Sequence, residues 1–135
     1  MLAYVAGPLF DEGERWWIRR LDELVAAAGY ATFLPHRDNP DKTADNCRKI
    51  YLNDRGAIDR ADVVVASLNG VATDDGTAWE IGYAVGRGVP VIAIYTDWRR
   101  RFDDEVVNLM IEESVERLVR SEEELRAALA DFLAR

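Results

Sequence analysis

The chain has 135 residues and a net charge of −8 at pH 7, which favours one acidic domain over residues 1–135 and argues against binding to nucleic acid. Hydrophobic residues make up 49% of the chain, but their longest runs have the length of strands, so we expect a packed core and no membrane-spanning helix. With one cysteine, Cys47, and no signal peptide, the sequence predicts a cytoplasmic protein without an internal disulfide.

Segments typical of strands alternate with segments typical of helices. The expected strands are Leu2–Ala6, Tyr30–Leu34, Asp62–Leu68, Val89–Tyr95 and Val115–Val119. The expected helices are Asp11–Ala28, Thr43–Arg60, Gly76–Arg87, Asp104–Glu113 and a last one opened by a capping box at Ser121–Glu124, with polar or charged loops over Pro35–Asp41 and Asp97–Asp103. This alternation predicts an α/β fold with a doubly wound, five-stranded parallel sheet and helices on both faces. The flavodoxin-like strand order 2-1-3-4-5 is the leading arrangement.

The ligand crevice of such a sheet lies at the carboxyl ends of the strands, here between the first and the third. The first strand carries Tyr4 and ends in the turn Gly7-Pro8, and the third is followed by a polar loop over Asn69–Asp75. Glu80 comes in the first turns of the next helix, as either an exposed helix residue or a catalytic carboxylate. Gly82 suggests that another element approaches this helix closely, because a surface helix favours better helix formers.

Other kinds of site have little support in the sequence. It contains no Gly-x-Gly-x-x-Gly motif and no P-loop, and its histidine and cysteine lack the spacing of metal ligands, so we expect neither a cofactor nor a metal. His36, in the loop after the second strand, is either a surface residue or a ligand contact. Asp74 and Asp75 also have two interpretations, because either acid serves as a helix N-cap or as a functional carboxylate.

Short motifs of moderate specificity lie along most of the chain. They are Tyr4–Phe10, Asn53-Asp54, Ala61-Asp62 before a valine-rich strand, Asp74, Trp79–Ala84 and Asn108–Met110. Together, and in the spacing from Asp54 through Asp62 to Glu80, they resemble the nucleoside 2-deoxyribosyltransferase family.

The resemblance implies an enzyme that cleaves the N-glycosidic bond of a 2'-deoxynucleoside and passes the sugar to another nucleobase, in nucleobase salvage. Glu80 matches the nucleophile that forms a covalent deoxyribosyl intermediate, as in a retaining glycosidase. Asp54 matches the acid that contacts the base and acts as the general acid/base. Tyr4 would donate a hydrogen bond to Glu80 and orient it.

The resemblance also implies contacts to the substrate. Asp74 matches the acid that holds the 5'-hydroxyl of the sugar, and Gly7 is expected at the same crevice. Phe10 and Trp79 are candidates to stack on the base, although each is equally well explained as a core residue. Asn108 would complete the 5' end of a neighbouring subunit's site, which implies a homo-oligomer, at least a dimer.

Three alternatives stay open at this point. Related deoxynucleoside 5'-monophosphate N-hydrolases share the fold and the nucleophile, but Asp74 would repel a phosphate unless Arg37 or Lys42 offsets its charge. The family's longer C-terminal extension has no clear counterpart here, so hydrolysis of the nucleoside is a second alternative with the same residues. A nucleotide-binding module without catalysis is the third, since the fold alone does not decide the function.

Overall fold

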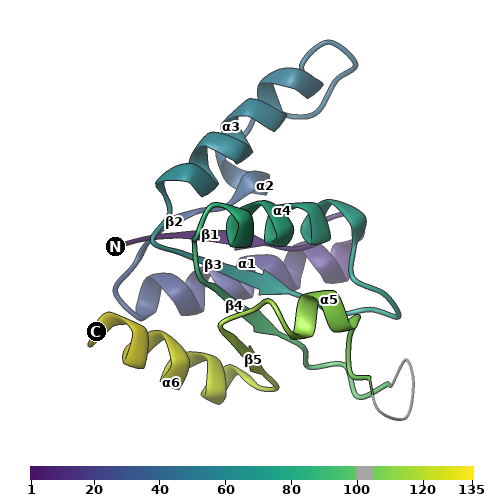
Figure 1. Ribbon diagram of the computed structural model, residues 1–135. Coiled ribbons are helices and arrows are strands. Elements are labelled where there is room, and N and C mark those ends of the chain that lie inside the picture. Colours follow the sequence, from purple (N-terminus) through teal and green to yellow (C-terminus); the bar gives the residue numbers. More distant parts are fainter. Residues whose placement is uncertain (100–104) are drawn as a thin grey trace.

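The structure is a computed structural model that describes residues 1–99 and 105–135 (Figure 1). Five strands form one parallel sheet: β1 (Leu2–Ala6), β2 (Ala31–Phe33), β3 (Val63–Ser67), β4 (Val91–Ile94) and β5 (Arg117–Val119). Their order is β2-β1-β3-β4-β5, so the flavodoxin-like arrangement predicted from the sequence is confirmed. The helices are α1 (Glu12–Ala27), α2 (Pro35–Asp38), α3 (Cys47–Arg60), α4 (Asp75–Gly86), α5 (Leu109–Glu112) and α6 (Glu122–Leu133).

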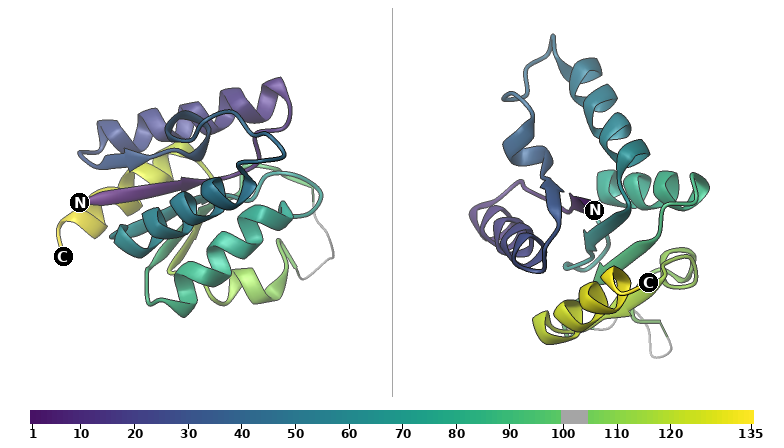
Figure 2. Two further views of the ribbon diagram at one scale, coloured as in Figure 1. Left: turned by 90° about the horizontal axis from the view of Figure 1, so that it is seen from above. Right: turned by 90° about the vertical axis from the view of Figure 1, so that its left-hand side faces the viewer.

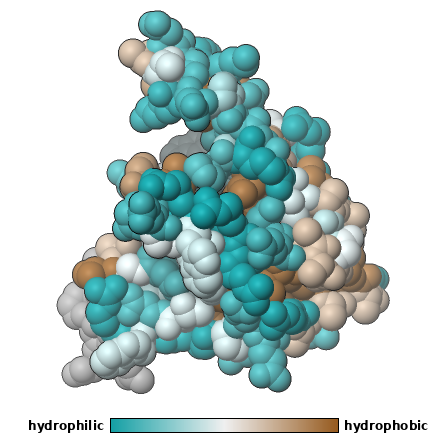
Figure 3. Space-filling model, turned by 180° about the vertical axis from the view of Figure 1, so that it is seen from behind, coloured by the Kyte–Doolittle hydropathy of each residue, from teal (hydrophilic) through white to brown (hydrophobic). Residues whose placement is uncertain are grey.

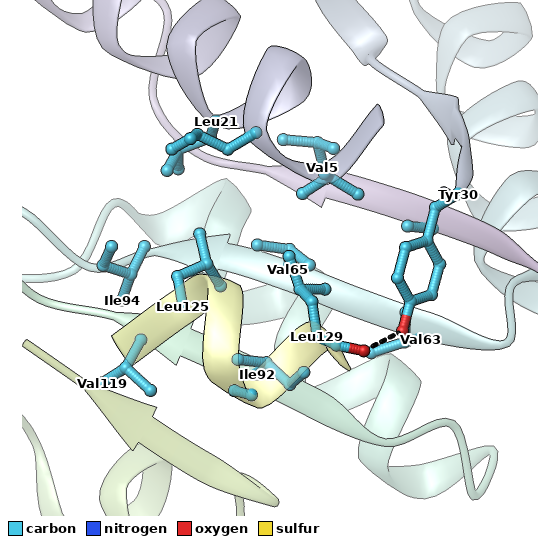
Figure 4. Close-up of a cluster of buried hydrophobic side chains, with 14 of the residues drawn as sticks. Val5, Leu21, Tyr30, Val63, Val65, Ile92, Ile94, Val119, Leu125 and Leu129 are labelled. Carbon is cyan, nitrogen blue, oxygen red and sulfur yellow. Dashed lines mark hydrogen bonds between the residues drawn. The ribbon is translucent and has the colours of Figure 1, made fainter. Parts of the chain in front are cut away.

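Helices cover both faces of the sheet, as expected for a doubly wound fold (Figures 1 and 2). On one face, α1 and α6 pack against aliphatic side chains of the strands, among them Val5, Val65 and Ile92 (Figure 4). On the other face, α3, α4 and α5 pack against the alternate strand residues, among them Tyr4 and Val64. The central strand β3 is buried on both faces, which is why its sequence is an unbroken apolar run instead of an alternating one.

Four helices, α1, α4, α5 and α6, begin at side chains that accept hydrogen bonds from free backbone N–H groups. Asp11 and Glu14 form a reciprocal capping box at the start of α1. Ser121 caps α6, but Glu124 accepts a hydrogen bond from the backbone N–H of Arg120. The capping box predicted over Ser121–Glu124 is therefore wrong in its second half, because the chain enters α6 with the Arg120 amide closer to that carboxylate.

The segment between β2 and α3 differs from the prediction in two ways. The loop predicted over Pro35–Asp41 contains the single turn α2, and α3 begins at Cys47 instead of Thr43. The side chain of Asn46 accepts from the backbone N–H of Thr43 and donates to the carbonyl of Asp41, and these local bonds hold the segment in a turn.

The helix predicted over Asp104–Glu113 is much shorter in the structure. Asp104 and most of the preceding charged loop lie outside the described residues, and the helix that follows, α5, covers only Leu109–Glu112. The side chain of Asn108 caps α5 by accepting from the N–H of Met110, which fixes its start. None of the helices in the described ranges is long and apolar enough to cross a membrane.

Candidate active site

A cavity of about 280 Å³ opens at the carboxyl edge of the sheet. Its walls come from the turn after β1, from α2 and the loop that follows it, from α3, and from the start of α4. The first turns of α3 and the loop before them stand out from the body as a mostly hydrophilic projection (Figures 1 and 3). Four carboxylates line the cavity, contributed by Asp41, Asp54, Asp74 and Glu80.

Glu80, in the second turn of α4, is held by a buried tyrosine of the sheet. The hydroxyl of Tyr4 donates a hydrogen bond of 2.5 Å to Glu80 Oε1. Tyr4 is fully buried in β1, and its ring stacks on that of Phe33 in β2 at 5.5 Å between centroids. The strand and its neighbour therefore fix the position of the donor before any ligand is present.

The environment of Glu80 favours its neutral form. Burial raises the pKa of Glu80 to about 7, the hydrogen bond from Tyr4 opposes this, and the negative charges of Asp54 and Asp74 add to it. The pKa of Tyr4 is also raised, first by its burial and then by the charge of Glu80, so Tyr4 stays a hydrogen-bond donor at neutral pH. A carboxyl group with a pKa near 7 is typical of catalytic sites.

Asp54, on α3, is the second carboxyl group with a raised pKa. Burial raises the pKa of Asp54, and a hydrogen bond of 2.6 Å from Asn39 Nδ2 to Asp54 Oδ1 works in the opposite direction. Sequence reasoning missed Asn39. The available signal was its place in a polar loop after the second strand, which ends at the same edge of the sheet as the first and third strands.

Asp74 is confirmed as a helix N-cap, and it also faces the cavity. It is the N-cap of α4, and its Oδ2 accepts from the backbone N–H of Thr77 at 2.9 Å and from the Thr77 hydroxyl at 3.0 Å. Asp75, in contrast, is exposed in the first turn of α4.

The two glycines singled out in the sequence have different surroundings. At Gly7, which lines the cavity, a Cβ atom would lie 2.6 Å from Ile18 Cδ1 and 3.1 Å from Ser67 Cβ, so a larger residue would require both side chains to shift. At Gly82, a Cβ atom would meet nothing within 4 Å. The expectation that another element of the chain approaches Gly82 closely is therefore wrong.

Four predicted site residues do not line this cavity within one chain. Tyr4 reaches it only through its hydrogen bond to Glu80, and the other three are Phe10, Trp79 and Asn108. Phe10 is 74% exposed, next to Leu9, which does line it. Trp79 lies on the outer side of α4, where its ring stacks on that of Tyr83 at 5.1 Å between centroids. Asn108 borders a second groove, of about 600 Å³, between α4 and α5.

The remaining lining residues include two basic side chains. His36 and Lys42 both reach the cavity, which favours the interpretation of His36 as a ligand contact. Within residues 1–99 and 105–135, no group of three or more His, Cys, Asp or Glu side chains is arranged to hold a metal ion. The described site thus combines a carboxyl group hydrogen-bonded by Tyr4, a second carboxyl group with a raised pKa and a polar rim.

The chain is similar to known proteins in both sequence and fold. The sequence model of the family described as nucleoside 2-deoxyribosyltransferase matches residues 3–114. A conserved protein from Enterococcus faecalis V583 has 28% sequence identity and a TM-score of 0.82, with 97% of this chain and 98% of that chain covered. None of the curated proteins compared with the chain matches it.

Two further solved structures are similar in fold. A 2-deoxyribosyltransferase from the psychrotolerant bacterium Bacillus psychrosaccharolyticus has 22% identity and a TM-score of 0.82, with 96% of each chain covered. The CMP N-glycosidase BcmB from Clostridium botulinum has 22% identity and a TM-score of 0.63, with 98% of this chain and 99% of that chain covered. Solved structures with this fold thus include both a transferase and an N-glycosidase.

Proposed function

The chain belongs to the nucleoside 2-deoxyribosyltransferase family, and from this premise we propose that it transfers 2-deoxyribose between nucleobases, with Glu80 as the nucleophile. The observation that carries the proposal is the hydrogen bond of 2.5 Å from the buried Tyr4 to Glu80 Oε1, at the edge of a cavity that also contains Asp54. A carboxylate held in this way suits attack on an anomeric carbon, because that carbon becomes cationic as the base departs.

The first half of the proposed reaction breaks the glycosidic bond. Glu80 attacks C1' of the deoxyribose while the electrons of the C1'–N bond move to the departing base. Asp54 gives its proton to a ring nitrogen of that base, which leaves as a neutral molecule. The products are a deoxyribosyl ester on Glu80, a free base and an ionised Asp54.

The second half reverses these roles. A ring nitrogen of the incoming base attacks C1', and the ester bond breaks to restore the Glu80 carboxylate. Asp54 accepts the proton that the incoming base loses. Burial raises the pKa of Asp54, which favours the protonated form that the first half-reaction needs.

Charge at the cavity favours a substrate without a 5'-phosphate. Four carboxylates line the cavity, and Lys42 is the fixed cation among its lining residues. Arg37 does not line it, because its guanidinium donates to Asp22, Asp38 and the Thr32 carbonyl. A phosphate with close to two negative charges would therefore be repelled.

We also propose that the active unit is a homo-oligomer. Asn108 borders the groove between α4 and α5, and Leu109 and Met110 beside it are 60% and 73% exposed. A second copy on this surface would cover those side chains and carry Asn108 toward a neighbouring cavity. Gly82 borders the same groove, and the open space beside it leaves room for the second copy of the chain.

Hydrolysis is the second candidate, and one observation favours it. Among the residues that line the cavity in the described chain, none is Phe, Tyr or Trp, so no large aromatic ring closes over the base. Water that reaches the ester on Glu80 would release free deoxyribose in place of exchange. The residues and the first half-reaction are the same.

The test is chromatography of nucleosides incubated with the purified protein. We expect deoxyinosine and adenine to yield deoxyadenosine, and Glu80→Ala to abolish this while Asp75→Asn, an exposed acid of the same helix, retains it. Free deoxyribose without exchange would make the protein a hydrolase. Cleavage of a deoxynucleoside monophosphate alone would overturn the charge argument, and ligand binding without any reaction would make it a binding module.

A further inference from the structure

A chain of side-chain hydrogen bonds connects Asp54 to two asparagines. Asn39 Nδ2 donates to Asp54 Oδ1 at 2.6 Å, and Asn53 Nδ2 donates to Asn39 Oδ1 at 3.2 Å. We propose that Asn39, held in turn by Asn53, is the positioning residue that aims Asp54 at the departing base. This inference rests on the proposed function, because it assigns a role within that reaction.

The hydrogen bonds of Asn39 allow only one orientation of its amide. Its Nδ2 donates both to Asp54 Oδ1 and to the carbonyl of Pro35, at 3.2 Å, while its Oδ1 accepts from Asn53. A rotation by 180° would bring the amide oxygen against two other oxygens and leave two N–H groups facing each other. Asn39 therefore presents a donor to Asp54 and has no N–H left for a substrate.

This fixed donor distinguishes the two oxygens of Asp54. Oδ1 is committed as an acceptor, so the proton that passes to the base is carried by Oδ2. Without Asn39, the carboxyl group could rotate and present either oxygen. General acid catalysis depends on the position of the acidic proton, so such freedom lowers the rate even when Asp54 itself is unchanged.

The segment that carries Asn39 is anchored to the rest of the fold. Asn39 directly follows the single turn α2, and Asp38 accepts a hydrogen bond of 2.8 Å from the backbone N–H of Leu34. Arg37 ties the same turn to Asp22 of α1 and to the Thr32 carbonyl of β2. The amide therefore sits on a rigid turn, as positioning of a catalytic group requires.

The test compares two substrates that differ in their need for a proton. Deoxyadenosine requires protonation of its base, whereas 7-methyl-2'-deoxyguanosine already has a cationic base that leaves neutral. We expect Asn39→Ala to lower kcat/KM for deoxyadenosine by about 10- to 100-fold, part of the rate that a positioned acid supplies, and to change it for the methylated substrate by less than about threefold. Asn53→Ala should show the same selectivity with a smaller loss.

A double-mutant cycle gives a second measurement that needs only deoxyadenosine. Since Asn39 acts through Asp54, the loss caused by Asn39→Ala should vanish in an Asp54→Ala background. The matched control is Asn69→Ala. The amide of Asn69 also makes two hydrogen bonds, both to Thr96, but Asn69 does not line the cavity. This substitution should leave kcat/KM for both substrates unchanged.

Two results would overturn the positioning role. Equal losses for both substrates would mean that Asn39 only supports the fold or contacts the substrate directly. If the losses of kcat/KM from Asn39→Ala and Asp54→Ala were additive in the double variant, Asn39 would likewise not act through Asp54. Inactivity of the unmodified protein toward every nucleoside would instead refute the proposed function, so the two failures can be told apart.

Discussion

Two tyrosines are buried on opposite faces of the same sheet, and their hydroxyl groups have different partners. Tyr30 belongs to the cluster under α1 and α6, and it donates to the backbone carbonyl of Leu129 at 2.9 Å (Figure 4). Tyr4 belongs to the cluster under α3 and α4, and it donates to the carboxylate of Glu80. Both hydroxyls are satisfied, as buried polar groups must be, but only one of them meets an ionisable group.

The partner decides what each region contributes. A carbonyl is neutral, so the bond of Tyr30 adds to stability without creating a charge inside the protein. A half-buried carboxylate is costly in its ionised form, and this cost appears as the raised pKa of Glu80. The α1/α6 face thus gives its tyrosine a neutral partner, whereas the α3/α4 face bears the cost of an ionisable one, the proposed nucleophile. Single substitutions should separate the two regions.

The largest expected effect is on catalysis, from Glu80→Gln. The amide keeps the shape and can still accept from Tyr4, but it cannot form the deoxyribosyl ester, so transfer should fall by about a thousandfold or more. The unfolding midpoint in urea at pH 8 should not decrease. Nucleoside exchange followed by chromatography measures the first effect, and retained exchange would exclude Glu80 as the nucleophile.

The converse substitution is Leu129→Ala, in the middle of the α1/α6 cluster. Leu129 is fully buried, so truncation leaves a cavity and should lower the free energy of unfolding by about 2–5 kcal/mol. Because the backbone carbonyl that binds Tyr30 remains, and the cavity of Glu80 lies on the other face, kcat at low temperature should stay close to the original value. A loss of kcat comparable to that of Glu80→Gln would show that the two faces are not independent.

The third effect is a dependence of stability on pH. Glu80 has a pKa of about 7 in the folded protein against an ordinary value of 4.5, so the folded state retains its proton to higher pH than the unfolded chain. Stability should therefore fall as pH rises from about 4.5 to about 7, by at most about 3 kcal/mol for a shift of this size. Urea unfolding should show that Glu80→Gln gains free energy of unfolding relative to the unmodified protein, and that this gain is larger at pH 8 than at pH 5. A gain that is equal at both pH values would contradict this assignment.

A smaller effect on catalysis is expected from Tyr4→Phe. The hydroxyl of Tyr4 lowers the pKa of Glu80 by stabilising its ionised form, so its removal should raise that pKa above about 7. At neutral pH less of the nucleophile is ionised and it is less well oriented, and kcat/KM should fall about tenfold. In a pH profile, the limb that reports Glu80 should move to higher pH. An unshifted limb would mean that Tyr4 only fills space.

The strands and helices were predictable from the sequence because local patterns carry them, and the strand order followed from the handedness of the crossovers between them. The unbroken apolar run Val63–Ser67 and the glycine stop at Gly29 are such patterns. The turn α2 and the short α5 were not, because each is held by a side-chain hydrogen bond, from the Leu34 N–H to Asp38 at α2 and from the Met110 N–H to Asn108 at α5. A pattern of hydrophobicity does not record a single hydrogen bond.

The candidate site was predictable where a residue's place on the sheet edge decided its position. Tyr4, Asp54 and Glu80 come together because β1, α3 and α4 meet there. Asn39 was missed because its partner is 15 residues away in the chain, on another element. Trp79 was a candidate to stack on the base, but residue type alone cannot say which side of α4 it occupies.

The smallest effect is expected from Tyr30→Phe, the counterpart of Tyr4→Phe on the other face. The change removes a hydrogen bond of 2.9 Å and leaves the Leu129 carbonyl without that donor, which should lower the free energy of unfolding by about 1 kcal/mol. Because that carbonyl belongs to α6, which packs on the face of the sheet opposite Glu80, the rate of transfer and its pH profile should stay unchanged. Urea unfolding and nucleoside exchange on the two Tyr→Phe variants make the comparison direct. If Tyr30→Phe also shifts the limb that reports Glu80, the sheet transmits changes between its faces, and the separation of a stabilising face from a reactive one does not hold.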